Sequence, residues 1–186
     1  MSPSRTEPDR LLWVDLETSA LEPGELHQIA SVVTDKNGDR LGPVLNARIK
    51  LEFPDLADPA ALAIGGYQPD GRFDAPESVC EYLNAHMRTA YFAGHNAHFD
   101  YGFTKQFLAQ YQGCGADDDL VKASPHHLCC TASLAMPLWV KGTVPNVSLK
   151  TLCDHFGISF RRTGFTHDAL DDIEATIQLY KKLIAL

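Results

Sequence analysis

The chain has 186 residues, 45% of them hydrophobic and 22% charged, and its formal net charge at pH 7 is −8. This length and composition are typical of one globular domain that buries enough surface to fold without disulfide or metal cross-links. The negative charge argues against a protein that coats nucleic acid through a broad basic surface. It does not exclude an enzyme that binds nucleic acid locally through metal ions and a few basic side chains.

Residues 1–10, MSPSRTEPDR, lack the apolar stretch of a secretion signal, and no apolar run reaches the ~20 residues of a membrane span. We therefore expect a disordered N-terminal arm at residues 1–10, a single domain at residues 11–186 and no membrane association. The five cysteines are odd in number and irregularly spaced. Free thiols in a reducing compartment, the cytoplasm, are expected. A zinc site within residues 114–130 is the less favoured alternative, because that stretch has no CxxC pair.

The first half of the domain is predicted to form antiparallel strands. LLWVDLE, residues 11–17, is an apolar run typical of a buried strand. Residues 27–35 and 43–52 have alternating apolar positions, and the DKNGDR sequence between them predicts a hairpin turn at Asn37-Gly38. Residues 52–74 are rich in Pro, Gly and Asp, which predicts a loop with one helical turn at residues 59–62.

The second half is predicted to alternate helices with strands. Helices are expected at residues 75–87 and 99–112, with a short strand at residues 90–96 between them. Residues 128–139 predict a strand, or a strand that passes into a helix. A short helix at residues 148–158 is followed by a long terminal helix at residues 166–186. Strands followed by alternating strands and helices predict an α/β fold with a mixed sheet and helices on its faces.

Asp15 and Glu17 are two carboxylates inside the first apolar strand. Residues two apart in a strand project from the same face, so their side chains lie together. Burying like charges side by side is costly. The residues alone leave three explanations open: a turn or helix cap, two solvent-facing residues on an edge strand, or a divalent cation shared by both carboxylates.

Two further stretches place acidic residues at the start of helices. Asp100 ends the sequence GHNAHFD, in the first turn of a helix, where a carboxylate interacts favourably with the helix dipole. His167 precedes the terminal helix, and Asp172 lies inside it. Taken separately, each stretch has a structural explanation. Asp100 is then a helix-capping residue, and the acidic residues of HDALDD, including Asp168 and Asp171, form a solvated first turn.

Together, the three stretches resemble the motifs of the DEDDh family of 3′–5′ exonucleases, which includes the DnaQ-like proofreading exonucleases and RNase T. DLET at residues 15–18 resembles the first motif, HNAHFD at residues 95–100 the second, and HDALDD at residues 167–172 the third. The resemblance covers residues 11 to about 182 and implies an RNase H-like fold. Its mixed five-stranded sheet has three antiparallel strands, then parallel strands, and is flanked by helices. One departure is Gln28, where many relatives have Glu.

The resemblance implies a metal-dependent enzyme that releases nucleoside monophosphates from the 3′ end of single-stranded or frayed DNA or RNA. It implies that two Mg²⁺ ions, replaceable by Mn²⁺, are held by Asp15, Glu17, Asp100 and Asp172, with Asp15 bridging the ions. It also implies that His167 is the general base. The substrate contacts that it implies are Thr18, Ile64, Gly65, Gly66, His95, Asn96 and Phe99.

Contacts to the substrate backbone are expected from four basic residues in the last third of the sequence: Lys141, Lys150, Arg161 and Arg162. Two alternatives stay open. In the first, the chain is a proofreading or processing subunit that works mainly within a polymerase or other nucleic-acid complex. In the second, it is a nucleic-acid-binding or structural domain that has lost catalysis. The intact acidic positions and His167 argue against the second. No residue indicates DNA or RNA preference, or the homodimer found in RNase T-like relatives.

Overall fold

The computed structural model describes residues 8–21, 24–112, 127–159 and 167–186. Its centre is a five-stranded sheet of order β3-β2-β1-β4-β5. The strands are β1 (Arg10–Thr18), β2 (Leu26–Asp35), β3 (Leu45–Arg48), β4 (Tyr91–Gly94) and β5 (Cys129–Cys130). β2 pairs antiparallel with β1 and β3, whereas β4 pairs parallel with β1 and β5. The predicted mixed sheet, with antiparallel strands followed by parallel strands, is confirmed.

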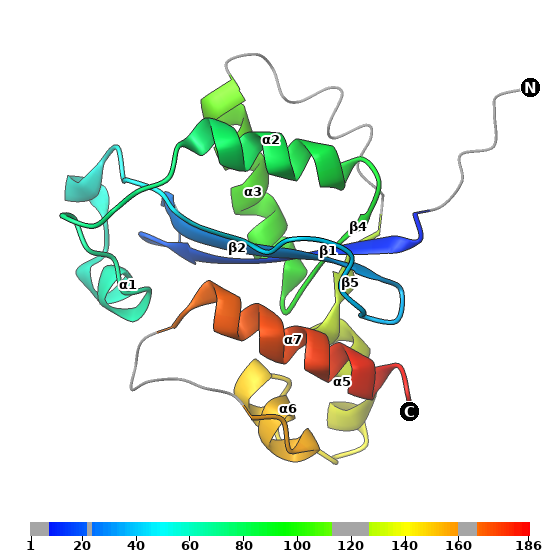
Figure 1. The fold of residues 1–186 in the computed structure, drawn as a ribbon. Helices are drawn as coiled ribbons and strands as arrows, with labels where there is room; N and C mark the ends of the chain where they lie inside the picture. Colours follow the sequence, from blue (N-terminus) through cyan, green and yellow to red (C-terminus); the bar gives the residue numbers. More distant parts are fainter. Residues whose placement is uncertain (1–7, 22–23, 113–126, 160–166) are drawn as a thin grey trace, which may run out of the picture.

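Helices cover both faces of the sheet (Figure 1). On one face lie α2 (Pro76–Met87) and α3 (Ala97–Gln112), and on the other lie α5 (Thr131–Val140), α6 (Leu149–Phe156) and α7 (Ala169–Leu183). A 3₁₀ turn, η1 (Pro54–Leu56), and a short helix, α1 (Pro59–Ile64), precede α2. Figure 1 shows α1 at the end of the sheet toward which the N-terminal end of α7 points.

Alternate residues of strand β1 pack against the helices on opposite faces of the sheet. Its even-numbered apolar residues belong to the core beneath α2 and α3, whereas Leu11 and Trp13 pack in a second cluster with residues of α7. Because side chains alternate along a strand, Asp15 and Glu17 follow Trp13 on the α7 face. The strand therefore places both carboxylates on the side of the sheet where the third motif begins its helix.

The structure differs from the sequence predictions mainly in the hairpin between β2 and β3. β2 is buried along both faces rather than on alternate residues, because helices cover both faces and strands flank it. β3 has only four residues, because the chain turns at Gly38, with φ of 86°, and residues 41–44 separate the turn from the strand. The predicted helical turn is a six-residue helix, α1, whose N-cap is Asp58.

The remaining elements follow the predictions closely. Residues 128–139 are the strand that passes into a helix, as β5 and α5. α6 begins after Ser148, whose side chain accepts a hydrogen bond from the Thr151 N–H, and ends at Gly157 with φ of 65°. β1 begins at Arg10, inside the predicted N-terminal arm, and residues 1–7 of that arm lie outside the described residues. None of the described helices is long and apolar enough to cross a membrane.

Candidate active site

Three functional groups from opposite ends of the sequence meet beside the sheet. Ligand atoms of Glu17, His167 and Asp172 all lie within 4.8 Å of one another. The Nδ1 atom of His167 is 4.0 Å from Glu17 Oε1 and 3.8 Å from Asp172 Oδ2. Glu17 comes from the end of β1, Asp172 from the first turn of α7, and His167 from the segment just ahead of that helix. The two carboxylates are largely buried, and His167 is partly exposed.

Asp15 and Asp100 do not belong to this three-residue group within the described ranges of the chain. Asp15 lies two residues before Glu17, on the same face of β1. Asp100 lies in the first turn of α3 and is buried. Burial raises the pKa of Asp100, backbone hydrogen bonds that include one at Leu16 oppose the shift, and the charge of Glu17 raises it further. Asp100 is therefore near enough to Glu17 to be destabilised by its charge.

The arrangement fits a divalent cation. Buried carboxylates close to one another repel, and a bound cation removes both the repulsion and the cost of desolvation. Carboxylate oxygens are the donors that Mg²⁺ and Mn²⁺ prefer. The zinc alternative has no such support in the described part of the chain: Cys129 and Cys130 lie on β5 and belong to no metal-ligand cluster there, and Cys114 and His126 lie outside the described residues.

The raised pKa of Asp100 predicts how pH changes the stability of the metal-free protein. Folding favours the neutral carboxyl of Asp100. The stability that this preference contributes is fully present below the unfolded pKa of about 3.9, and it is lost as the pH rises through the pKa of Asp100 in the folded state. In EDTA, the thermal midpoint of the wild type should fall relative to that of Asp100→Asn as pH rises from about 4 to above neutrality. Mg²⁺ should reduce this difference. Parallel pH curves for the two proteins would contradict the assigned environment of Asp100.

Asp168 fixes the start of α7 beside His167. Its carboxylate accepts hydrogen bonds from the Leu170 N–H at 3.0 Å, as the N-cap, and from Gln28 Nε2 at 3.2 Å. Arg48 Nη2 lies 3.8 Å from the same carboxylate. Asp168 is thus more than a solvated first-turn residue, because it ties α7 to β2 and β3. Gln28, the departure from the family pattern, is buried and belongs to this hydrogen-bond network.

The segment Ile64–Gly66 lies directly against the cluster. The backbone N–H of His167 donates a hydrogen bond to the Ile64 carbonyl at 2.7 Å. Gly65 packs so closely that a Cβ atom there would lie 2.6 Å from His27 Cε1 and 2.9 Å from Glu17 Cβ. The structure therefore brings the segment expected to cover the terminal base next to both Glu17 and His167.

Replacing Gly65 by Ala should lower both stability and activity. The φ of Gly65 is −78°, which Ala adopts readily, so the expected loss of about 1–3 kcal/mol comes from overpacking against His27 and Glu17. Gly66→Ala is the matched control, because Gly66 has φ of 62° and a Cβ atom added there would meet no other atom within 4 Å. It should cost about 1–2 kcal/mol through backbone strain alone. Thermal unfolding and cleavage assays test this, and wild-type stability and activity of Gly65→Ala would contradict the role of packing at Gly65.

The other residues expected to contact substrate lie around this centre in different environments. His95 Nδ1 lies 2.9 Å from Thr131 Oγ1, and burial lowers the pKa of His95 to about 4, so its neutral ring links β4 to α5. Asn96 is exposed at the turn into α3, with φ of 63°. Thr18 is partly buried at the end of β1, and Phe99 is partly buried on α3.

Phe99 also lines a groove of about 370 Å³ along α3, the helix that contains Asp100. The lining residues are Leu21, His98, Phe99, Gly102, Phe103 and Gln106. Leu21 is 78% exposed and was not predicted as a site residue. The available signal was a large apolar side chain placed three residues after the DLET motif, outside any predicted strand. The groove offers an apolar surface on the helix that also contains Asp100.

The family model "RNase_T: Exonuclease" matches residues 12–180. The chain belongs to this exonuclease family. The match covers all three motifs and every acidic residue described above, so the family resemblance expected from the sequence is confirmed. No individual curated protein sequence matches this exonuclease domain.

Solved structures of exonuclease I share the fold of this exonuclease domain. The E. coli enzyme in complex with a dT13 oligonucleotide aligns with a TM-score of 0.76 and 19% identity, over 94% of this chain and 41% of that chain. Exonuclease I from Methylocaldum szegediense gives a TM-score of 0.72 and 22% identity, over 95% and 43% of the two chains. The expected RNase H-like fold is confirmed. This exonuclease domain spans about two fifths of the length of these relatives.

Proposed function

We propose that this exonuclease domain hydrolyses phosphodiester bonds from the 3′ end of single-stranded or frayed nucleic acid and releases nucleoside monophosphates. The observation that supports the proposal most directly is the convergence of Glu17, His167 and Asp172, with Asp100 close enough to interact electrostatically with Glu17. The dT13 oligonucleotide bound to the E. coli relative supports a single-stranded substrate.

Two Mg²⁺ ions are the proposed cofactors, with Mn²⁺ able to substitute. Asp15, Glu17, Asp100 and Asp172 would hold them, because four carboxylates supply the oxygen donors that Mg²⁺ prefers. When bound, such a pair of ions stabilises the charge on the attacking and leaving oxygens of phosphodiester hydrolysis. Burial of Glu17, Asp100 and Asp172 keeps water from screening these charges.

His167 is the proposed general base, which takes a proton from the attacking water. Imidazole suits this role because it exchanges protons near neutral pH. The backbone of His167 is fixed by its hydrogen bond to Ile64 and by the Asp168 cap that follows it. Its side chain is 30% exposed, so a proton accepted at the ring can pass to solvent.

The terminal nucleotide is proposed to lie between the Ile64–Gly66 segment and the groove along α3. Apolar surfaces at Ile64, Leu21 and Phe99 would contact bases without strong sequence preference. Thr18 belongs to the first motif and His95 and Asn96 to the second, and we propose that they position the sugar and phosphate.

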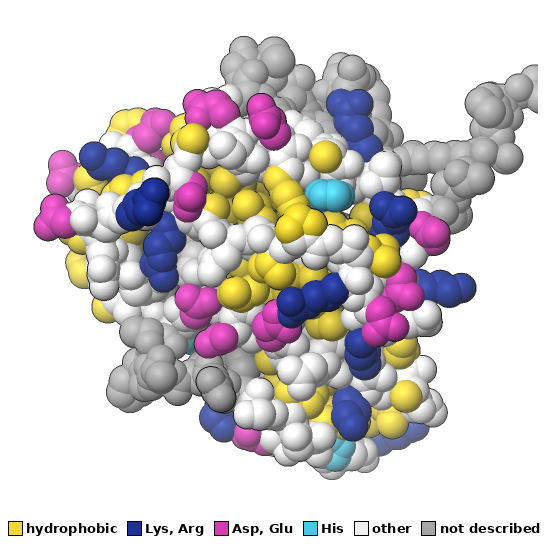
Figure 2. Space-filling model, viewed as in Figure 1, with side chains coloured by type: hydrophobic (Ala, Val, Ile, Leu, Met, Phe, Trp, Pro, Cys, Tyr) yellow, Lys and Arg dark blue, Asp and Glu magenta, His cyan; other side chains and the backbone are white. Residues whose placement is uncertain are grey.

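Contacts to the rest of the strand are proposed to be local. On the face shown in Figure 2, acidic and basic side chains are interspersed, with no broad basic field among the described residues of that face. Of the basic residues expected to bind the backbone, Lys141 is exposed, and Lys150 pairs with Asp154 at 2.6 Å. Arg161 and Arg162 lie outside the described residues. This distribution favours short or unpaired substrates over long duplexes.

The test is cleavage of 5′-labelled oligonucleotides in Mg²⁺, with EDTA as control. Single-stranded DNA, duplex DNA and RNA of the same sequence are compared on denaturing gels. A ladder that shortens from the 3′ end and disappears in EDTA supports the proposal. Internal cuts, release of the labelled 5′ nucleotide, or an intact substrate at high enzyme concentration would overturn it. The comparison also decides between DNA and RNA.

A second candidate function is that of a nuclease subunit in a larger complex, with a polymerase or as a homodimer. One observation favours it: helix α5 exposes four large apolar side chains, Leu134, Met136, Trp139 and Val140. Exposed apolar patches of this kind commonly mark protein contacts. Light scattering coupled to size-exclusion chromatography tests for the homodimer, and co-purification tests for a polymerase.

We propose the cytoplasm as the location of this exonuclease domain. The free thiols at Cys80, Cys129, Cys130 and Cys153 fit its reducing conditions.

A further inference from the structure

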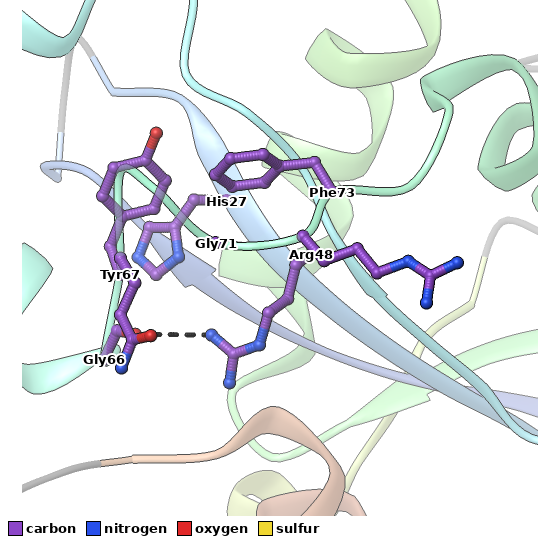
Figure 3. Close-up of a pocket in the computed structure, with 8 residues that line it drawn as sticks. His27, Arg48, Gly66, Tyr67, Gly71 and Phe73 are labelled. Atoms are coloured by element: carbon purple, nitrogen blue, oxygen red, sulfur yellow. Dashed lines mark hydrogen bonds between the residues drawn. The ribbon is translucent and has the colours of Figure 1, made fainter.

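A separate cavity of about 300 Å³ lies beside the Gly66 end of the Ile64–Gly66 segment (Figure 3). β2 contributes His27, β3 contributes Arg48, and the loop before α2 contributes the rest of the wall. The lining residues are His27, Arg48, Gly66, Tyr67, Gln68, Gly71, Arg72 and Phe73. No member of the carboxylate and histidine cluster lines it, so its chemistry is different from that of the candidate active site.

His27 forms the buried inner wall of this cavity, with its ring edge packed against Gly65. The side chain is only 1% exposed, and neither ring nitrogen has a hydrogen-bond partner among the described residues. Buried polar atoms without partners are rare, because each costs free energy. Burial, and next the charge of Arg48, lower the pKa of His27 to about 4, so the ring is neutral at pH 7 and adds no positive charge to the wall.

The rest of the wall combines two cations with two aromatic rings. Arg48 and Arg72 supply guanidinium groups, which bind phosphate oxygens through paired hydrogen bonds. Tyr67 and Phe73 lie with ring centroids 5.9 Å apart, and the His27 ring lies 5.3 Å from that of Tyr67. Figure 3 shows the rings of Tyr67 and Phe73 on the same side of His27, with Arg48 reaching the Gly66 carbonyl. An anionic group and a flat ring find complementary surfaces here.

We propose that this cavity is a second nucleotide-binding site. Arg48 and Arg72 hold the phosphate, and the base packs against Tyr67 and Phe73. A volume of about 300 Å³ is at the lower limit for small-molecule sites, which fits one nucleotide rather than a longer segment. The ligand is a free nucleoside monophosphate or a single nucleotide of a bound strand. Neither requires a divalent cation.

Calorimetric titration of 5′-AMP into the full chain in EDTA tests the proposal, because removal of the metal separates this site from catalysis. Arg72→Gln is the test variant, since Arg72 is exposed and Arg48 also contacts Asp168. Arg88→Gln is the matched control, because Arg88 is an exposed arginine at the end of α2 and does not line the cavity. Adenosine and inorganic phosphate separate the contributions of base and phosphate, and an oligothymidylate separates strand from free nucleotide.

The expected result is one bound 5′-AMP per chain, with affinity reduced roughly tenfold or more by Arg72→Gln and unchanged by Arg88→Gln. In the wild type, the NMR signals of the His27 ring should shift as 5′-AMP is added. Oligothymidylate binding that Arg72→Gln weakens assigns the site to a nucleotide of the strand, and unaffected oligothymidylate binding assigns it to the free nucleotide. Absence of 5′-AMP binding, or binding that Arg72→Gln leaves unchanged, would overturn the proposal.

Discussion

Asp172→Asn should abolish metal-dependent hydrolysis, with a loss of at least about 10³-fold, the upper scale for removing one charge-stabilising group from an active site. The substitution keeps the shape of the side chain and removes its charge. Asp172 is buried, and its carboxylate lies 3.8 Å from His167 in the cluster that also contains Glu17. Because a ligand that binds only the folded state stabilises it, Mn²⁺ should raise the thermal midpoint of the wild type and not that of the variant.

Asp171→Asn is the matched control for this prediction. Asp171 is the neighbouring residue in the first turn of α7, is exposed and undergoes the same change of charge. It should retain both hydrolysis and stabilisation by Mn²⁺. If Asp172→Asn cleaves 3′ ends at the rate of Asp171→Asn, the cluster is not the catalytic centre.

His167→Ala should reduce the rate of hydrolysis by roughly 10²–10⁴-fold, as removal of a general base typically does. Metal binding should survive, because the four carboxylates remain and the backbone of residue 167 keeps its hydrogen bond to Ile64. Single-turnover cleavage measures the rate, and the rise in thermal midpoint with Mn²⁺ measures metal binding. Imidazole added to the solution should restore part of the lost rate.

The control for the histidine prediction is His155→Ala, since His155 is exposed on α6 and lies outside the cluster. Its rate should equal that of the wild type. Cleavage by His167→Ala at the original rate would remove His167 from the mechanism. Joint loss of cleavage and of Mn²⁺ stabilisation in His167→Ala would instead make His167 a metal ligand.

The sequence predicted those parts of the fold and site that depend on local patterns. Alternation along β1 placed Asp15 and Glu17 on one face, and the start of α3 put Asp100 in a first turn. The helix predicted at residues 148–158 is α6, which begins after the Ser148 cap and ends at Gly157. Such features are encoded by neighbours in the chain, where periodicity and backbone preference act directly.

Features that depend on packing between distant segments could not be predicted in the same way. The hydrogen bond from Gln28 to Asp168 joins residues 140 positions apart, and nothing local to either residue indicates it. The raised pKa of Asp100 follows from burial beside Glu17, which only the assembled sheet produces. The cavity around His27 likewise needs β2, β3 and the following loop to come together. Family motifs identified the reacting groups but not the residues that hold them in place.

Anomalous diffraction from crystals of the wild-type chain grown with Mn²⁺ tests the central claim most directly. We predict two manganese peaks about 3.5–4 Å apart. Oxygen atoms of Asp15, Glu17 and Asp172 should contact these peaks, and Asp100 should lie beside the second. Crystals that show no manganese at these carboxylates, at a concentration that supports cleavage of 3′ ends, would contradict the account.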